Sequence, residues 1–179
     1  MIRENCPYKV IKSLKYEIGR IIVYQDTFLI NEEECIYTYT VNKDSVCVLP
    51  IYENNVVAIE QYRYTLDSWL LELPAGAIDE CETGEQAARR ELAEETGFIA
   101  DELIYLGEYF MNQGISSAKC KMYYANCINK GETNYDKTEF IKTKLIPINE
   151  FDKMIDNNEF NLLIGLAGWN LAKKKKLIR

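Results

Sequence analysis

Three glutamates near the middle of the chain have the spacing of a metal-binding site. Seven of the 23 residues at positions 76–98 are acidic, and Glu91, Glu94 and Glu95 are among them. In a helix, Glu91 and Glu95 lie one turn apart on the same face, with Glu94 beside them. Like charges repel at this spacing, so we expect a cation among them. Clustered carboxylates suit Mg²⁺ or Mn²⁺, which usually keep several waters and bind a phosphate-bearing substrate.

The local sequence predicts that residues 85–96 form this helix. Thr83 is the expected N-cap, since a glutamine three residues later can complete a capping box, and Gly97 is placed to end the helix. Ala88 and Leu92 fall on the adjoining strip of the helix surface. We therefore expect that edge to pack on a sheet while the carboxylates face a groove.

The segment resembles the Nudix box, a motif defined by nine spaced positions. Every one of them is filled here, by Gly76, Glu82, Arg90, Glu91, Leu92, Glu94, Glu95, Gly97 and Phe98. The resemblance implies that the last three glutamates are metal ligands and that Arg90 is a brace that orients them. Arg90 can pair with Glu94 on the next turn of the helix. Glu82 either joins the metal site or stabilises the start of the helix. The alternative is an acidic amphipathic helix that simply faces solvent.

The chemistry implied is metal-assisted hydrolysis of a diphosphate linkage. Carboxylates repel pyrophosphate and can bind it only through bridging cations, which also lower the pKa of an attacking water. The sequence contains no histidine, which excludes the usual general base and any Ser-His or Cys-His nucleophile system.

A second resemblance concerns the run QYRYTLDSWLLELPAGAID at residues 61–79. It is similar to the ADP-ribose pyrophosphatase group of Nudix enzymes, in which a Gln-Tyr-Arg strand and a Glu-Leu-Pro-Ala-Gly exit precede the box. This implies that Ala75 gives a backbone oxygen to the metal and that Arg63 contacts the phosphate or ribose of the substrate. The alternative for Arg63 is a salt bridge on the face of a strand.

The same resemblance implies that the general base is a glutamate on a loop after the box. Glu139 matches best, with Glu94 or Asp136 as alternatives. Members of the group commonly carry a proline where this chain has Gln113. Gly114 keeps the turn there and is a candidate for substrate binding, although the loss of the proline predicts a more tolerant pocket.

Three functional interpretations follow from these residues. The first is a hydrolase that converts ADP-ribose, or a related nucleotide sugar, to AMP and ribose 5-phosphate. The second is a Nudix hydrolase for another diphosphate, such as a dinucleotide or a coenzyme. The third is a ligand sensor without catalysis, against which the intact set of box glutamates argues.

Composition limits the possible partners. The 179 residues contain 47% hydrophobic and 27% charged residues, as in ordinary globular proteins, and the net charge of −7 argues against nucleic acid. No apolar run approaches the length of a membrane span, and the N-terminus lacks the apolar core of a signal peptide, so we expect a cytoplasmic protein that does not bind membranes. The six cysteines form no CxxC pair, which favours reduced thiols.

The first part of the chain predicts a small antiparallel β subdomain, residues 1–43. Its strands are expected at 8–13, 18–24 and 35–41, with polar turns at 25–27 and 31–34. A sheet of this size cannot bury both faces alone. In the resembling group this region packs across a homodimer and helps to form the substrate pocket, so we expect a homodimer.

Residues 44–179 predict a Nudix hydrolase domain of the α/β class. Strands are expected at 45–52, 56–64, 69–73, 103–111, 119–128 and 140–148, a hairpin turn at 53–55, a polar loop at 129–138, and helices at 149–157 and 161–175. Pro74 and Gly76 predict a sharp exit from a strand into a loop, so that the Ala75 carbonyl can face the metal groove. Strands on both sides of the box helix, followed by a long helix, imply a mixed sheet between helices. The resemblance agrees and implies a Nudix-type α/β/α sandwich.

Overall fold

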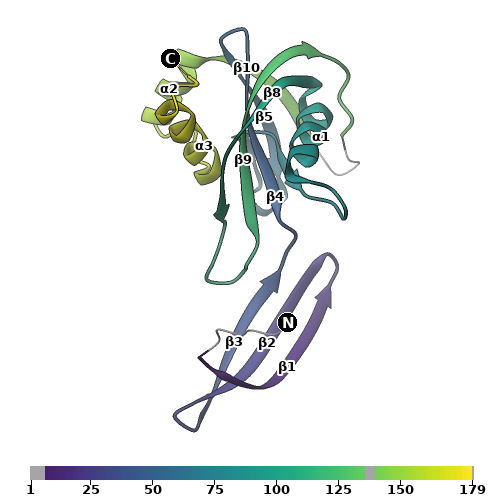
Figure 1. Ribbon diagram of the computed structural model, residues 1–179, viewed down its shortest axis with the longest axis vertical. Helices are drawn as coiled ribbons and strands as arrows, with labels where there is room; N and C mark the ends of the chain where they lie inside the picture. The colour runs from purple at the N-terminus through teal and green to yellow at the C-terminus, as the bar shows by residue number, and fades with distance from the viewer. Residues whose placement is uncertain (1–6, 136–139, 179) are drawn as a thin grey trace. The chain divides into compact units, whose positions relative to one another are not determined.

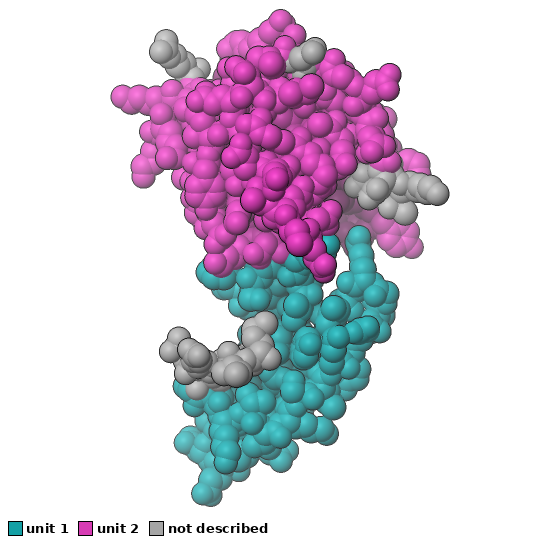
Figure 2. All heavy atoms as spheres, turned by 45° about the vertical axis from the view of Figure 1, so that its right-hand side comes forward, with its two compact units in different colours: residues 1–43, 110–118 teal, residues 44–109, 119–179 magenta. Residues whose placement is uncertain are grey.

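The computed structural model of the protein describes residues 7–135 and 140–178. Their contacts form two compact units (Figure 2). The first comprises Met1–Lys43 and Phe110–Ala118, and the second comprises Asp44–Tyr109 and Lys119–Arg179. The division into an N-terminal β subdomain, residues 1–43, and a Nudix hydrolase domain, residues 44–179, stays a prediction.

The first unit is built on a three-stranded antiparallel sheet with the order β1-β2-β3. Its strands are β1 (Lys9–Ile18), β2 (Ile21–Ile30) and β3 (Glu33–Val41). Residues 110–118 join this sheet through β3, since the Thr40 backbone N–H donates to the Ile115 carbonyl over 2.7 Å. The predicted antiparallel N-terminal sheet is therefore confirmed.

The predicted turn at residues 25–27 is wrong. These residues lie in the middle of β2, and the chain instead reverses at Gly19, whose φ of 57° is a conformation that glycine adopts without strain. The polar character of the segment has another cause. Asp26 is only 5% exposed, and its carboxylate accepts a hydrogen bond of 2.5 Å from the Ser13 hydroxyl on β1.

The second unit contains a mixed sheet. Its strands are β4 (Ser45–Tyr52), β5 (Asn55–Arg63), β6 (Ser68–Glu72), β7 (Ala75–Ala77), β8 (Phe98–Phe110), β9 (Lys119–Lys130) and β10 (Ile141–Pro147). Within the described residues these seven strands follow the order β10-β5-β4-β9-β8, with β6 beside β5 and β7 beside β4. β4 runs parallel to β9 but antiparallel to β5 and β7, so the predicted mixed sheet is confirmed.

Helices cover both faces of this sheet (Figure 1). They are α1 (Gly84–Thr96), α2 (Ile148–Asp156) and α3 (Leu163–Lys174), and a short 3₁₀ turn, η1 (Tyr64–Leu66), follows β5. Alternate side chains of β4 point to opposite faces: Val46 and Val48 pack with α1, whereas Cys47, Leu49 and Ile51 pack with α2 and α3. Two cores on one sheet make an α/β/α sandwich, as predicted.

The predicted exit from the strand at Pro74 is present, but residues 75–77, predicted as a loop, form the short strand β7. β6 pairs with β5 and β7 pairs with β4, so the chain changes neighbours at this point. A proline has no N–H to donate to a strand ladder. Its carbonyl, however, accepts from the Val48 N–H over 2.9 Å, which carries the chain to β4. The break places Ala75 to Ala77 directly beside α1.

The five cysteines in the described part of the chain are all free thiols, as expected. None of the helices that the structure describes is long and apolar enough to cross a membrane.

Candidate active site

Helix α1 is held at both ends by the residues that the sequence predicted. At the N-terminus, the Gln86 backbone N–H donates to the Thr83 hydroxyl over 3.2 Å, and the Gln86 side chain accepts from the Thr83 N–H over 2.8 Å. At the C-terminus, Gly97 has φ 75° and its N–H donates to the Ala93 carbonyl. Leu92 is fully buried, which contributes about 2 kcal/mol to packing on the sheet. The helix is therefore a rigid base for the carboxylates.

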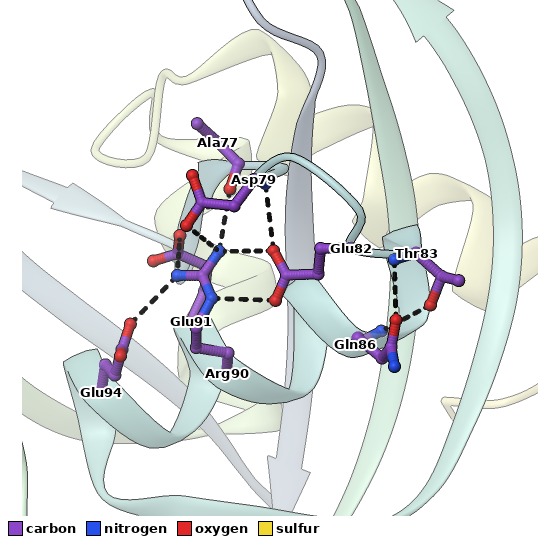
Figure 3. Close-up of polar contacts among 8 residues, drawn as sticks. All are labelled: Ala77, Asp79, Glu82, Thr83, Gln86, Arg90, Glu91 and Glu94. Carbon is purple, nitrogen blue, oxygen red and sulfur yellow. Dashed lines mark hydrogen bonds and ion pairs between the residues drawn. The ribbon is translucent and has the colours of Figure 1, made fainter.

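Arg90 is the centre of the polar contacts around this helix (Figure 3). Its guanidinium makes two hydrogen bonds of 2.9 Å to Glu82, one of 2.7 Å to Glu91 and one of 3.1 Å to Glu94. It also donates to the Ala77 carbonyl over 2.9 Å. The predicted pair with Glu94 is thus present, and the same side chain connects the helix to the loop before it.

Glu82 lies in the loop immediately before the N-cap of the helix. Its carboxylate forms a bidentate pair with Arg90 and accepts from the Asp79 N–H over 3.1 Å, which closes the turn that leads into the helix. The Arg90 guanidinium lowers the pKa of Glu82, and this carboxylate in turn is the main reason that the pKa of Arg90 is raised. Glu82 therefore holds Arg90 and does not line the cleft described below.

Strand β7 approaches α1 so closely that a side chain at position 76 would displace the Glu91 carboxylate. A Cβ added there would lie 2.0 Å from a carboxylate oxygen of Glu91. One residue earlier, the Ala75 N–H donates to Glu95 over 2.9 Å, and Glu95 is only 4% exposed. Two of the predicted metal ligands therefore lie directly against the β7 backbone.

These groups surround a cleft of about 300 Å³. It is lined by Ala75, Gly76, Ala77, Asp79, Arg90, Glu91, Glu94, Glu95, Asn134 and Tyr135. The structure thus brings together the predicted ligands from β7 and α1. Their roles stay a prediction, because position alone does not assign a role.

The donor set of the cleft fits a divalent cation. Glu91, Glu94, Glu95 and the backbone at Ala75 supply oxygen atoms, which are the preferred ligands of Mg²⁺ and Mn²⁺. In the described part of the chain, no three acidic side chains yet converge closely enough to form a complete metal site. The hydrogen bonds to Arg90 and Ala75 explain this arrangement. Since a carboxylate has two oxygens, one can keep such a bond while the other coordinates a cation.

Other predicted site residues do not line this cleft. Arg63 forms a bidentate ion pair with Glu72, with two N···O distances of 2.6 Å, which is the strand-face salt bridge considered as its alternative. Gly114 belongs to the first unit, where its carbonyl accepts a hydrogen bond from the Tyr37 hydroxyl. Glu139 and Asp136, two candidates for the general base, lie outside the described residues.

Four residues that line the cleft were not predicted: Ala77, Asp79, Asn134 and Tyr135. Asp79 lies within the box segment but occupies none of its fixed positions. Asn134 and Tyr135 belong to the polar loop after β9, where nothing in the sequence indicates a contact with α1. That contact is made by the backbone: the Asn134 N–H donates to the Glu94 carbonyl over 2.9 Å, and the Gly131 N–H donates to the Gly97 carbonyl over 2.6 Å.

Comparison with known families shows to which family the chain belongs. A family model described as the NUDIX domain matches residues 41–164, well over half of the chain. The chain belongs to the Nudix family. The prediction made from the box is therefore confirmed, and Nudix hydrolases in general use divalent metal ions.

Several relatives are similar to this chain over most of its length. The chain is 30% identical to the "Methanol dehydrogenase activator" of Bacillus methanolicus, over 74% of this chain and 75% of the relative. It is 28% identical to "ADP compounds hydrolase NudE" of Escherichia coli and 25% identical to "ADP-ribose pyrophosphatase" of Bacillus subtilis. These two alignments span 67% and 64% of this chain, and each spans 64% of the relative's length.

A solved structure agrees with the fold. The structure titled "Crystal structure of ADP compounds hydrolase" aligns with a TM-score of 0.83, covering 93% of this chain and 92% of that chain. The identity is 22%, so the likeness supports the fold alone. It is the Nudix-type α/β/α sandwich that was predicted.

Proposed function

We propose that this protein hydrolyses the diphosphate linkage of ADP-ribose, or of a related nucleotide sugar, to AMP and ribose 5-phosphate. The observation that carries the proposal is the single cleft shared by Glu91, Glu94, Glu95 and the Ala75 backbone. Two relatives are named for activity on ADP compounds and on ADP-ribose, and they supply the substrate class. The resemblance of the run at residues 61–79 to the ADP-ribose pyrophosphatase group supports the same class.

In this mechanism the three cleft carboxylates would hold Mg²⁺ or Mn²⁺ together with the Ala75 carbonyl. A bound divalent cation supplies neutralisation of the diphosphate oxygens and a lower pKa for the attacking water. Arg90 restrains Glu91 and Glu94 through its hydrogen bonds, so that their oxygens stay directed at the cleft. Among the residues that the structure describes, Glu94 is the candidate for the base that takes the proton of the water. Glu139 and Asp136 are the alternatives.

Arg63 and Gly114 are proposed as substrate-binding residues on the strength of the resemblance. For Arg63, the ion pair with Glu72 fixes the plane of the guanidinium, because both Nε and Nη2 are bonded to one carboxylate. We further propose a cytoplasmic homodimer. The relative from Bacillus methanolicus is named for a protein target and not for a substrate, so it favours no particular diphosphate.

A substrate panel tests the proposal. ADP-ribose, ADP-glucose, NADH, coenzyme A and ATP are compared at equal concentration with Mg²⁺, and the products are identified by chromatography. We expect ADP-ribose to react fastest, other ADP-sugars to be accepted, and no inorganic phosphate to appear. A preference for ATP with release of pyrophosphate would overturn the substrate assignment, and a preference for NADH or coenzyme A would favour the second interpretation.

A further inference from the structure

Tyr135 is the one aromatic residue among the described residues that line the cleft. The rest of the lining consists of carboxylates, one arginine, one asparagine and the small residues of β7. The carboxylates can hold a diphosphate through cations, but they offer no surface to a planar base. The three small residues, Ala75 to Ala77, carry at most a methyl group. Tyr135, which is 37% exposed, is therefore the lining side chain whose ring can cover a planar base.

The backbone holds the residues before Tyr135 against the metal-binding helix. Glu94 is one of the last four residues of α1, whose carbonyls have no partner within the helix. The Asn134 N–H donates a hydrogen bond of 2.9 Å to the Glu94 carbonyl. Tyr135 thus follows directly after a residue that is hydrogen-bonded to the helix carrying the metal ligands.

A second contact brings the beginning of the same segment close to the end of the helix. The Gly131 N–H donates to the Gly97 carbonyl over 2.6 Å. A Cβ at Gly97 would lie 2.6 Å from the Gly131 carbonyl oxygen, and the φ of 75° already favours glycine there. The two backbone bonds, at Gly131 and Asn134, hold this segment against the end of α1, and its residues Asn134 and Tyr135 line the cleft.

We propose that the Tyr135 ring stacks on the nucleobase of the substrate and thereby selects nucleoside diphosphate compounds. A base has a π face that an aromatic ring can cover, whereas the sugar on the other side of the diphosphate has none. The inference deepens the proposed function and rests on it, because it assigns one half of the substrate to one wall of the cleft. Neither the Nudix box nor the run at residues 61–79 includes this residue.

Each product of the proposed reaction contains one half of the substrate, so the two halves can be tested separately. AMP carries the base and ribose 5-phosphate does not, so we would measure the dissociation constant of each by calorimetry with Mg²⁺ present. In Tyr135→Ala, AMP should bind about 5- to 100-fold more weakly, the range given by loss of one base–aromatic stack. The affinity for ribose 5-phosphate should stay within about twofold. Tyr135→Phe should restore AMP binding, since the ring and not the hydroxyl makes the contact.

Tyr105→Ala is the matched control, because Tyr105 is 51% exposed on β8 and does not line the cleft. It should leave both affinities unchanged. Equal AMP affinity in Tyr135→Ala and the wild type, or an equal loss for both products, would overturn the stacking proposal. Hydrolysis of ADP-ribose by the wild type is measured separately. Turnover without an effect of Tyr135 on AMP sinks this inference alone, whereas absence of turnover sinks the proposed function.

Discussion

Arg90 shows how one side chain can organise several like charges. Three glutamates share its guanidinium, and the bidentate pair with Glu82 fixes its plane. The spacing of Arg90 and Glu94 in the sequence predicted their contact, because residues four apart face each other on a helix. The contact with Glu82, eight residues earlier, could not be predicted from helical spacing. It depends on how the loop before the helix folds back over it.

Arg90→Lys tests this organisation. Lysine has a single ammonium group and cannot reproduce the planar, bidentate contact with Glu82 while also reaching Glu91 and Glu94. We expect a folded protein that needs a higher Mg²⁺ concentration for half-maximal activity and has a lower kcat. Titration of the initial rate with Mg²⁺ measures both effects.

Arg89→Lys is the control for that variant. Arg89 is the neighbouring arginine, contacts Glu85 and the Ala100 carbonyl, and does not line the cleft. Its Mg²⁺ requirement should match that of the wild type. If both variants gave the wild-type titration curve, Arg90 would not orient the ligands.

The meeting of β7 and α1 depends on the absence of a side chain at Gly76. Gly76→Ala would place a Cβ where the Glu91 carboxylate lies, at 2.0 Å from its nearest oxygen. Because this carboxylate is the flexible end of a side chain, the protein should still fold, but the carboxylate must move out of its place.

We therefore expect Gly76→Ala to keep cooperative unfolding while losing most of the rise in Tm that Mg²⁺ gives the wild type. Calorimetry with and without Mg²⁺ measures this difference. A wild-type rise in Tm on adding Mg²⁺ would mean that the position of Glu91 does not matter for cation binding.

Helices α2 and α3 are joined by an acid-sensitive contact. The Asp152 carboxylate accepts from the Lys173 ammonium over 2.8 Å and from the Trp169 indole over 3.0 Å. Mainly because of the bond from Lys173, the pKa of Asp152 lies below its ordinary value. A carboxylate with a lowered pKa adds stability above its unfolded-state pKa of about 3.9, and this contribution is lost as the pH falls through the folded-state value.

Asp152→Asn should therefore lower the free energy of unfolding by about 1 kcal/mol at neutral pH, a modest value because both partners are partly exposed. The difference from the wild type should narrow as the pH is lowered from about 5 to about 3. Denaturant unfolding of both proteins at a series of pH values measures this difference in the free energy of unfolding. Asp156→Asn on the same helix serves as the control, and a gap independent of pH would contradict the linkage.

The sequence predicted these elements better than their junctions. Residues 149–157 and 161–175 were expected as helices, and α2 and α3 lie within two residues of those bounds, because caps and apolar spacing are local signals. The pairing of residues 75–77 with β4 and the turn at Gly19 were not predicted. Each depends on which strand the chain pairs with next, and a neighbouring strand leaves no signal in the local sequence.

The same distinction applies to the site. The metal-ligand candidates were predictable because the box places them on one helix. Asn134 and Tyr135 reach the cleft through two backbone hydrogen bonds, which any residue type except proline can donate. The side chains of Asn134 and Tyr135 therefore form no sequence pattern from which their place in the cleft could have been predicted.

The first unit, considered by itself, exposes much of its apolar surface. Strand alternation and register place Ile18 and Tyr16 of β1, Ile21 of β2 and Ile36 of β3 on one face of the three-stranded sheet, and all four are 46–68% exposed. Exposed apolar side chains on one face of a sheet are candidates for a contact with another chain. This is the physical support for the proposed homodimer.

Light scattering at micromolar concentration should give the mass of a dimer. Ile36→Glu should shift the mass toward 20.8 kDa, the mass of one chain, because a charge would be buried in the contact. Leu163→Glu is the matched control, since Leu163 is 80% exposed at the start of α3, in the second unit. A fully active wild-type monomer would contradict the proposal.

The central claim is that the cleft between β7 and α1 hydrolyses ADP-ribose with a bound divalent cation. Its most direct test is the initial rate of AMP release from ADP-ribose, measured for the wild type and for Glu95→Gln at saturating Mg²⁺. Glutamine can still accept the Ala75 hydrogen bond, so the fold should persist while one charged oxygen is lost. Glu85→Gln, on an exposed part of the same helix, controls for the substitution itself. We predict AMP and ribose 5-phosphate from the wild type and from Glu85→Gln, no turnover when the metal is chelated, and a fall in kcat of several orders of magnitude for Glu95→Gln. Near-normal turnover by Glu95→Gln at saturating Mg²⁺ would contradict the account.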